Sequence, residues 1–247
     1  MLKNKVAIIT GGSRGIGYAI ARKFAENGAA LLLVALHEER LLQAQKQIRE
    51  IGGNVEIIYG DIAEPAFSKR IVERALEIFG TIDILVNCAG MITRTPVASL
   101  TLDEWHRVIN VNLHGTFYLS QAVLPVLCAK NYGKIINITS QMARLPHPNA
   151  SPSYAVSKAG MVALTRHLAY HYARYNICVN AIAPGSIDTD LAKSMPDEAR
   201  QRFKNAVPFQ RLGDPEEVGE LALFLASDNS NYITGATMNI SGGSLMD

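Results

Sequence analysis

The alternation of short apolar runs with longer amphipathic segments is the feature that most constrains the fold of this 247-residue chain. The short runs are rich in β-branched residues, and apolar residues recur at helical spacing between them. That order is typical of parallel strands joined by crossover helices. It predicts strands at 6–10, 30–36, 55–59, 82–87, 134–139, 177–182 and 237–240, and helices at 15–26, 38–51, 65–79, 102–129, 153–175 and 215–226.

The predicted fold is therefore α/β, with a doubly wound seven-stranded parallel sheet and helices on both faces. No internal repeat and no long Gly/Ser/Pro linker divides the chain, so we expect a single domain over residues 1–247. Two proline-containing loops, 141–152 and 183–213, follow predicted strands. Open α/β sheets bind ligands at this carboxyl edge, so we expect both loops to shape the substrate site.

Composition excludes several classes of protein. The 24 Lys and Arg residues exceed the 22 Asp and Glu residues by two and are scattered, so a nucleic-acid partner is not expected. The longest apolar run, 29–36, is too short to span a membrane. The odd number of cysteines, Cys88, Cys128 and Cys178, with no CxxC spacing, suggests neither a disulfide framework nor a zinc site. We expect a cytoplasmic protein without a metal.

A glycine-rich turn follows the first predicted strand and opens the first predicted helix. Its sequence is Thr10-Gly11-Gly12-Ser13-Arg14-Gly15-Ile16-Gly17. Glycines permit a tight turn and close approach to a pyrophosphate, while a helix N-terminus offers free N–H groups and partial positive charge. The position of this turn within a βαβ unit predicts a dinucleotide site.

Tyr154 and Lys158 are four residues apart in a predicted helix, so both side chains lie on one face. A free phenol has a pKa near 10 and is a poor acid or base at neutral pH. A neighbouring ammonium group favours the phenolate, so we expect Lys158 and a nearby nicotinamide ring to lower the pKa of Tyr154. A Tyr and a Lys at this spacing are otherwise ordinary surface neighbours.

Together these motifs resemble the short-chain dehydrogenase/reductase family. The glycine turn is similar to that family's TGxxxGxG sequence, and Asn87-Cys88-Ala89-Gly90 is similar to its NNAG sequence with one substitution. Asn112, Ser140, the segment from Tyr154 to Lys158, and Pro184-Gly185 follow in the family's order. The resemblance covers residues 5–243 and implies a Rossmann-like fold and hydride transfer between a carbonyl and a secondary alcohol.

The resemblance also implies roles for individual residues. Tyr154 would be the general acid or base, Ser140 would bind the substrate oxygen, Lys158 would bind the nicotinamide ribose and tune Tyr154, and Asn112 would hold a proton-relaying water. Asp61 would contact adenine, and Thr189 would meet the carboxamide of the nicotinamide. For Asn87, a structural role that locks adjacent strands is an equal alternative to direct contact with the cofactor. The implied cofactor-binding residues are Gly11, Ser13, Arg14, Gly15, Ile16, Gly17, Asp61, Ile62, Asn87, Ala89, Gly90, Tyr154, Lys158, Pro184, Gly185, Ile187 and Thr189.

The residue at the end of the second strand indicates which cofactor is bound. NAD-preferring members of the family usually carry an acidic residue there, where this chain has Ala35 or Leu36. Arg14 in the glycine turn could pair with a 2′-phosphate. NADP(H) is favoured and NAD(H) is the alternative, because Leu36 and His37 supply no second arginine.

The substrate class is less constrained than the chemistry. The segment 207–243 resembles bacterial 3-oxoacyl-acyl-carrier-protein reductases, which favours a carrier-bound acyl thioester as the small carbonyl substrate. A sugar or polyol dehydrogenase is the alternative within the family, and a non-catalytic dinucleotide-binding sensor or scaffold is the alternative from another class. The family resemblance further implies a homotetramer.

Overall fold

The computed structural model describes residues 1–146, 150–189 and 197–246, and contains one seven-stranded sheet. All neighbouring strands in it pair in parallel, in the order β3-β2-β1-β4-β5-β6-β7. The order reverses between β1 and β4, which places the topological switch point there. The strands are β1 (Val6–Thr10), β2 (Ala30–Ala35), β3 (Val55–Tyr59), β4 (Ile84–Asn87), β5 (Gly133–Ile138), β6 (Ile177–Pro184) and β7 (Thr237–Ile240).

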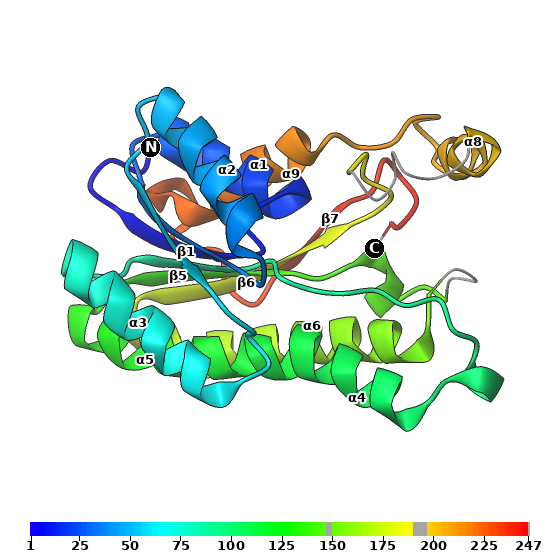
Figure 1. The fold of residues 1–247 in the computed structure, drawn as a ribbon, viewed down its shortest axis with the longest axis horizontal. Helices are drawn as coiled ribbons and strands as arrows, with labels where there is room; N and C mark the ends of the chain where they lie inside the picture. Colours follow the sequence, from blue (N-terminus) through cyan, green and yellow to red (C-terminus); the bar gives the residue numbers. More distant parts are fainter. Residues whose placement is uncertain (147–149, 190–196, 247) are drawn as a thin grey trace.

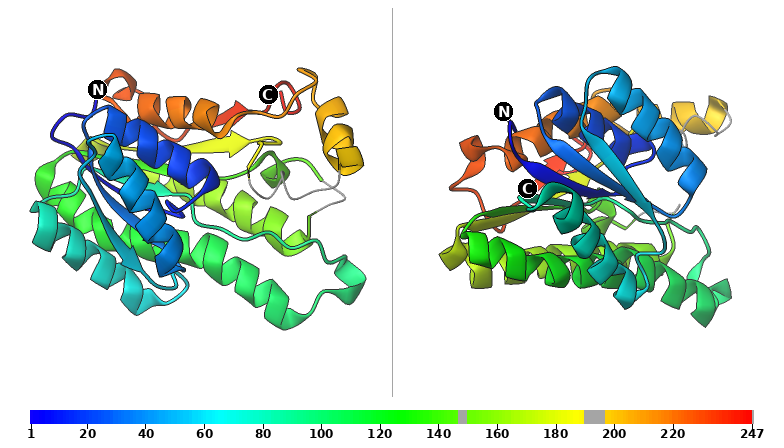
Figure 2. Two further views of the ribbon diagram at one scale, coloured as in Figure 1. Left: turned by 45° about the horizontal axis from the view of Figure 1, so that its top comes forward. Right: turned by 60° about the vertical axis from the view of Figure 1, so that its left-hand side comes forward.

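Helices cover both faces of this sheet (Figure 1). One layer holds α1, α2 and α9, the opposite layer holds α3 to α6, and α8 lies apart near the end where β6 and β7 finish (Figures 1 and 2). The helices are α1 (Gly15–Glu26), α2 (Glu38–Glu50), α3 (Pro65–Phe79), α4 (Leu102–Ile109), α5 (Gly115–Lys130), α6 (Pro152–Tyr172), α8 (Asp197–Asn205) and α9 (Pro215–Ala226).

The sheet forms because its central strands are apolar on both faces. Every residue of β1, β4, β5 and β6 is buried. Alternate side chains point to opposite helical layers, so Ile9 packs in one core cluster with Phe24 while Ile8 packs in the other with Phe67. The predicted parallel sheet covered on both faces is confirmed.

One predicted helix is divided in the structure. The segment 102–129 forms α4, a π-helical turn over Asn110–His114, and then α5. The wider turn places Asn112 where its amide reaches the backbone of Met91, in the segment after β4. Hydrophobic periodicity does not reveal such a turn, which is frequent at functional sites.

Other boundaries differ by a few residues. Strand β2 ends at Ala35 instead of residue 36, and β4 begins at Ile84 instead of residue 82. Strand β6 continues two residues beyond the predicted end because Ala183 and Pro184 still pair with β7. Among the described residues, no helix combines the length and apolar character needed to cross a bilayer.

Helix α9 begins with a complete capping box. The Asp214 carboxylate accepts from Glu216 N at 2.9 Å, and the Glu217 carboxylate accepts from Asp214 N at 2.8 Å. Arg211 holds Glu217 in place and, with the backbone N–H of Asp214, lowers the pKa of Glu217 to about 2. The sequence predicted this start correctly.

We expect Asp214→Ala to lower the free energy of unfolding by about 1 kcal/mol, because one helix N–H loses its acceptor. Urea denaturation would measure the change. Glu73→Ala, at an exposed position of α3, is the control and should change the midpoint little. A loss no larger than that of the control would contradict the assigned cap.

Candidate active site

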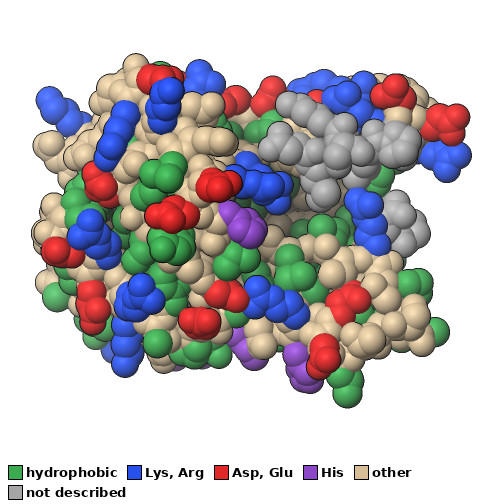
Figure 3. Space-filling view, in the orientation of Figure 1, with side chains coloured by type: hydrophobic (Ala, Val, Ile, Leu, Met, Phe, Trp, Pro, Cys, Tyr) green, Lys and Arg blue, Asp and Glu red, His purple; other side chains and the backbone are tan. Residues whose placement is uncertain are grey.

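The candidate site is a cavity of about 660 Å³ at the carboxyl edge of the sheet. Its walls come from the residues that follow β1, β2, β3, β4, β5 and β6, and from the first turns of α1 and α6. The space-filling view shows this hollow, with Lys and Arg side chains along its rim (Figure 3). The cavity therefore lies where the topology predicts ligand binding.

Two glycines let the first turn pack closely. A Cβ on Gly17 would lie 2.2 Å from the carbonyl oxygen of Gly11, and a Cβ on Gly11 would lie 2.9 Å from the Ala89 backbone. Gly11 and Gly15 also have positive φ values, +69° and +55°. Because side chains at 11 and 17 would meet backbone atoms, the turn requires glycine at both positions.

The N-terminus of α1 fits a bound phosphate. Arg14, the N-cap residue, makes no side-chain capping hydrogen bond, and the first turn of α1 contains no acidic residue. By contrast, α4, α6 and α9 each begin with a capping hydroxyl or carboxylate. The free N–H groups of α1 open into the cavity, so this end suits the pyrophosphate of a dinucleotide.

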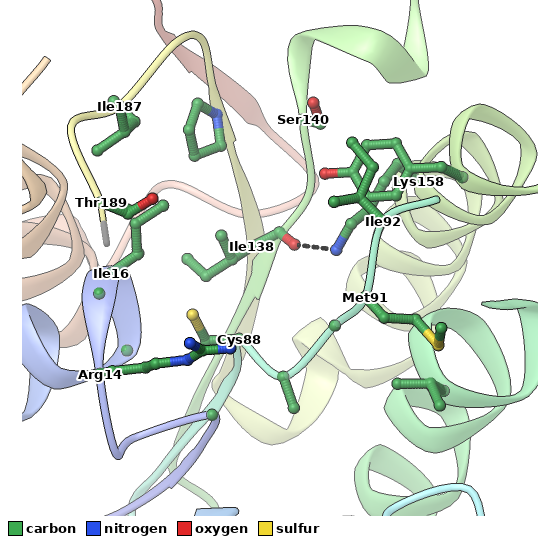
Figure 4. Close-up of a pocket in the computed structure, with 18 of the residues that line it drawn as sticks. Arg14, Ile16, Cys88, Met91, Ile92, Ile138, Ser140, Lys158, Ile187 and Thr189 are labelled. Atoms are coloured by element: carbon green, nitrogen blue, oxygen red, sulfur yellow. Dashed lines mark hydrogen bonds between the residues drawn. The ribbon is translucent and has the colours of Figure 1, made fainter. Parts of the chain in front are cut away.

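Ser140, Tyr154 and Lys158 come together on the opposite wall. Ser140 is the second residue after the end of β5, while Tyr154 and Lys158 lie in the first two turns of α6. The Lys158 Nζ donates to the Ile138 carbonyl at 2.8 Å and lies 5.8 Å from the centre of the Tyr154 ring. Figure 4 shows Lys158 reaching towards β5 below Ser140, with Arg14 and Thr189 on the other side of the hollow.

Burial dominates the electrostatics of this pair. Lys158 is 4% exposed, and burial lowers the pKa of its ammonium group to about 8. Burial also raises the pKa of the Tyr154 phenol, while the Ser140 hydroxyl lowers it in part. Without a bound dinucleotide the pKa of Tyr154 is therefore raised, and its expected lowering by Lys158 together with a nicotinamide ring stays a prediction. The cost of removing the phenolate from water exceeds the stabilisation that its protein neighbours provide.

The two asparagines of the predicted site face the protein interior and do not line the cavity. Asn112 is fully buried, and its amide accepts from Met91 N at 2.8 Å and donates to Met91 O at 2.9 Å and to Ser157 Oγ at 3.0 Å. Asn87 donates to Asn137 Oδ1 at 2.9 Å, which joins β4 to β5. These contacts agree with the structural alternative for Asn87, and the water-holding role of Asn112 stays a prediction.

All other predicted site residues line the cavity, although the ligands assigned to them stay predictions. Asp61, expected to meet adenine, has its carboxylate engaged by Arg107 at 2.6 Å and by Ala63 N at 2.9 Å. Of the two predicted substrate loops, Pro148 and Pro196 lie outside the described residues. The described part of the second loop includes α8, which adds Arg200 and Phe203 to the wall.

Sequence reasoning missed several side chains in the cavity wall, among them Arg40 and Gln141. Arg40, in the first turn of α2, lines the same cavity as Arg14 and has no ion pair among the described residues. The position of Arg40 in the sequence does not indicate that it lines the cavity. It reaches the cavity only because α2 turns back over the end of β2. Gln141 follows Ser140 and lines the cavity beside it.

The histidine pair His167 and His171 and the thiol of Cys88 take no part in this chemistry. The rings of His167 and His171 pack 4.4 Å apart, and no cluster of three metal-ligating side chains occurs in the described parts of the chain. Burial raises the pKa of the Cys88 thiol to about 12. Cys88 thus carries no thiolate at neutral pH.

Comparisons with known proteins agree with this geometry. A family model described as enoyl-(acyl carrier protein) reductase matches residues 11–244. The chain is 37% identical to the 3-oxoacyl-[acyl-carrier-protein] reductase of Thermotoga maritima, and 36% identical to a 3alpha-hydroxysteroid dehydrogenase of Mediterraneibacter gnavus. The first alignment covers 98% of both chains, and the second covers 98% of this chain and 97% of its relative.

Solved structures are similar over the same length. A putative gluconate dehydrogenase of Agrobacterium tumefaciens superposes with a TM-score of 0.94 at 33% identity, covering 100% of this chain and 98% of the other. Levodione reductase superposes with a TM-score of 0.93 at 31% identity, covering 98% of both chains. The likeness therefore extends over the whole sheet and both helical layers.

We expect the Lys158 ammonium group of the dinucleotide-free protein to titrate near pH 8. NMR of protein labelled at lysine Cε would follow it, and the Lys158→Gln variant would assign the signal. The unfolded chain holds this proton up to about pH 10.5, so this group's contribution to unfolding free energy rises between pH 8 and that value. A titration near 10.5 would contradict the desolvation.

Proposed function

Because the chain belongs to the short-chain dehydrogenase/reductase family and is an oxidoreductase acting on carbonyl or alcohol groups, we propose that it is an NADP(H)-dependent 3-oxoacyl thioester reductase. The observation that carries the proposal is the convergence of Ser140, Tyr154 and Lys158 on one cavity that also contains the glycine turn. Because the chain belongs to a family of oxidoreductases, we do not propose the alternative of a non-catalytic sensor or scaffold. A cytoplasmic protein is also proposed, in keeping with its three free cysteines.

The residues of the chain have distinct roles in this proposal. A bound nicotinamide ring would supply or accept the hydride. Tyr154 gives its proton to the carbonyl oxygen in reduction and takes it back in alcohol oxidation. Ser140 donates a hydrogen bond to the same oxygen as negative charge develops on it. Lys158 would hold the ribose hydroxyls of the dinucleotide. Asn112 fixes the Met91 segment and, in this proposal, would hold the proton-relaying water.

Deprotonation of Tyr154 needs more positive charge than the protein alone supplies. Lys158 is the cation buried beside the phenol, and its own pKa is lowered to about 8. Hydrogen bonds from the ammonium group to ribose oxygens would favour its charged form, and an oxidised pyridine ring adds a second positive charge. Dinucleotide binding thus brings the Tyr154 pKa down towards the working range.

Arg14 and Arg40 support the preference for NADP(H). Both are exposed arginines that line the cavity. Strand β2 ends at Ala35, and neither this residue nor Leu36 and His37 after it carries a carboxylate to accept from a ribose hydroxyl. Guanidinium groups pair strongly with phosphate. Arg40 supplies the second arginine that Leu36 and His37 lack.

The substrate class follows from the relatives and from the character of the cavity wall. Beside the arginines Arg94 and Arg200, the lining includes a set of large apolar side chains: Met91, Ile92, Met142, Phe203 and Leu212. An acyl chain suits such a wall better than a polyol does, which favours the thioester. The polyol alternative draws its support from the structural likeness to a putative gluconate dehydrogenase.

A homo-oligomer, proposed as a tetramer, would be built on the outer helices. Several large apolar side chains are exposed on α4, α5 and α6, including Leu102, Phe117 and Val156. These are the helices through which the family resemblance implies packing. Burial of these side chains would stabilise the assembly.

We expect Tyr154→Phe to lower kcat for 3-oxobutyryl thioester reduction by at least about 100-fold, because the proton donor is lost while the ring and its packing remain. Absorbance of NADPH at the nicotinamide band would measure turnover, and NADPH fluorescence would check binding. Tyr170→Phe, at an exposed position of α6, is the control. Turnover retained in Tyr154→Phe would contradict the proposal.

We expect Arg14→Ala and Arg40→Ala each to raise KM for NADPH about tenfold and to change KM for NADH little, because only NADPH carries the 2′-phosphate. Steady-state kinetics with both cofactors would measure this. Arg166→Ala, on the exposed surface of α6, is the control. Equal changes for NADPH and NADH would remove the assignment of that arginine.

A further inference from the structure

The side-chain amide of Gln141 lies beside the catalytic groups without a hydrogen-bond partner. Gln141 follows Ser140, is 8% exposed and lines the cavity. Its Oε1 is buried and unpartnered, and within the described parts of the chain its NH2 group donates to no protein acceptor. Buried polar groups are almost always paired, so an unpaired amide in a cavity wall indicates a place where a ligand completes the bonding.

The surrounding backbone fixes where this amide stands. Gln141 begins a 3-10 turn, and its carbonyl accepts from Arg144 N at 3.1 Å and Leu145 N at 3.0 Å. Its Oε1 packs against Gly185, where an added Cβ would lie only 3.1 Å away. With Oε1 packed against Gly185 and excluded from solvent, the NH2 end is the part of the amide left to the cavity.

We propose that Gln141 recognises a second oxygen of the substrate, by donating a hydrogen bond from its NH2 group to the thioester carbonyl of a 3-oxoacyl group. This inference rests on the proposed function. Ser140 donates to the ketone oxygen that is reduced, and Gln141 donates to the thioester carbonyl oxygen two carbons away. A monoketone has no oxygen at that place and leaves the amide unpaired.

This assignment separates the substrate classes on chemical grounds. The group left to the cavity is a donor, and the thioester carbonyl is a pure acceptor. The neighbouring apolar residues Met91, Ile92 and Met142 line the space for the rest of the acyl chain. Gln141 is thus a specificity-determining residue that orients a 1,3-dicarbonyl and takes no part in proton transfer.

The test compares two substrates that differ only in the second oxygen. One is the N-acetylcysteamine thioester of 3-oxobutyrate, and the other is the monoketone in which a methylene replaces the thioester carbonyl. The variants are Gln141→Met, which keeps the length without a donor, and Gln141→Glu, which keeps the shape with acceptors only. Gln47→Met, the same substitution at an exposed position of α2 that does not line the cavity, is the matched control.

We expect wild-type kcat/KM to be at least about tenfold higher for the thioester than for the monoketone. Both Gln141 variants should abolish this ratio, mainly through a higher KM for the thioester, while their activity on the monoketone persists. The Gln47→Met control should keep the wild-type ratio. Circular dichroism would verify folding, and if one Gln141 variant does not fold, the other decides.

Three results would overturn the inference. An equal loss on both substrates in the Gln141 variants would show a structural role, and a wild-type ratio near one would show that the second oxygen is not recognised. A wild-type preference for hydroxyketones over both substrates would likewise refute the dicarbonyl assignment. If the wild type reduces neither ketone with NADPH or NADH, the proposed function itself fails, which is a different outcome.

Discussion

The burial of the Lys158 ammonium group is the interaction on which the rest of the site depends. Its hydrogen bond to the Ile138 carbonyl ties the second turn of α6 to the end of β5, the strand that also delivers Ser140. Water that would otherwise solvate the charge is excluded, so the ammonium group loses protons more readily than a free lysine. The same exclusion would make the proposed interactions of this group with a dinucleotide stronger than they would be in water.

The backbone around this charge is held by interactions that leave the cavity open. Asn112 uses its amide to fix the Met91 segment, and the π-helical turn between α4 and α5 places Asn112 there. On the other wall, Gly11 and Gly17 allow β1 and α1 to meet closely and leave the N-terminus of α1 unblocked. One wall therefore suits proton transfer and the other suits a phosphate, with the space for hydride transfer between them.

The side chains proposed to recognise the cofactor and the substrate lie around the catalytic residues. Arg40 comes from α2, the helix that turns back after β2, and Gln141 comes from the 3-10 turn after β5. Neither Arg40 nor Gln141 belongs to the sequence motifs that contain the catalytic residues. This division agrees with the different substrates named for the relatives, a 3-oxoacyl-[acyl-carrier-protein] in one and a hydroxysteroid in another.

The sequence by itself determined the parallel sheet, the glycine turn and the pairing of Tyr154 with Lys158. These follow from local rules: continuous apolar runs make buried strands, glycines allow positive φ, and a spacing of four places two side chains on one helical face. Tertiary structure decided which electrostatic effect prevails at Tyr154, because desolvation depends on everything packed around the phenol. It also decided that Arg40 and Gln141 enter the cavity, since contacts between segments distant in the chain leave no periodic pattern in the sequence.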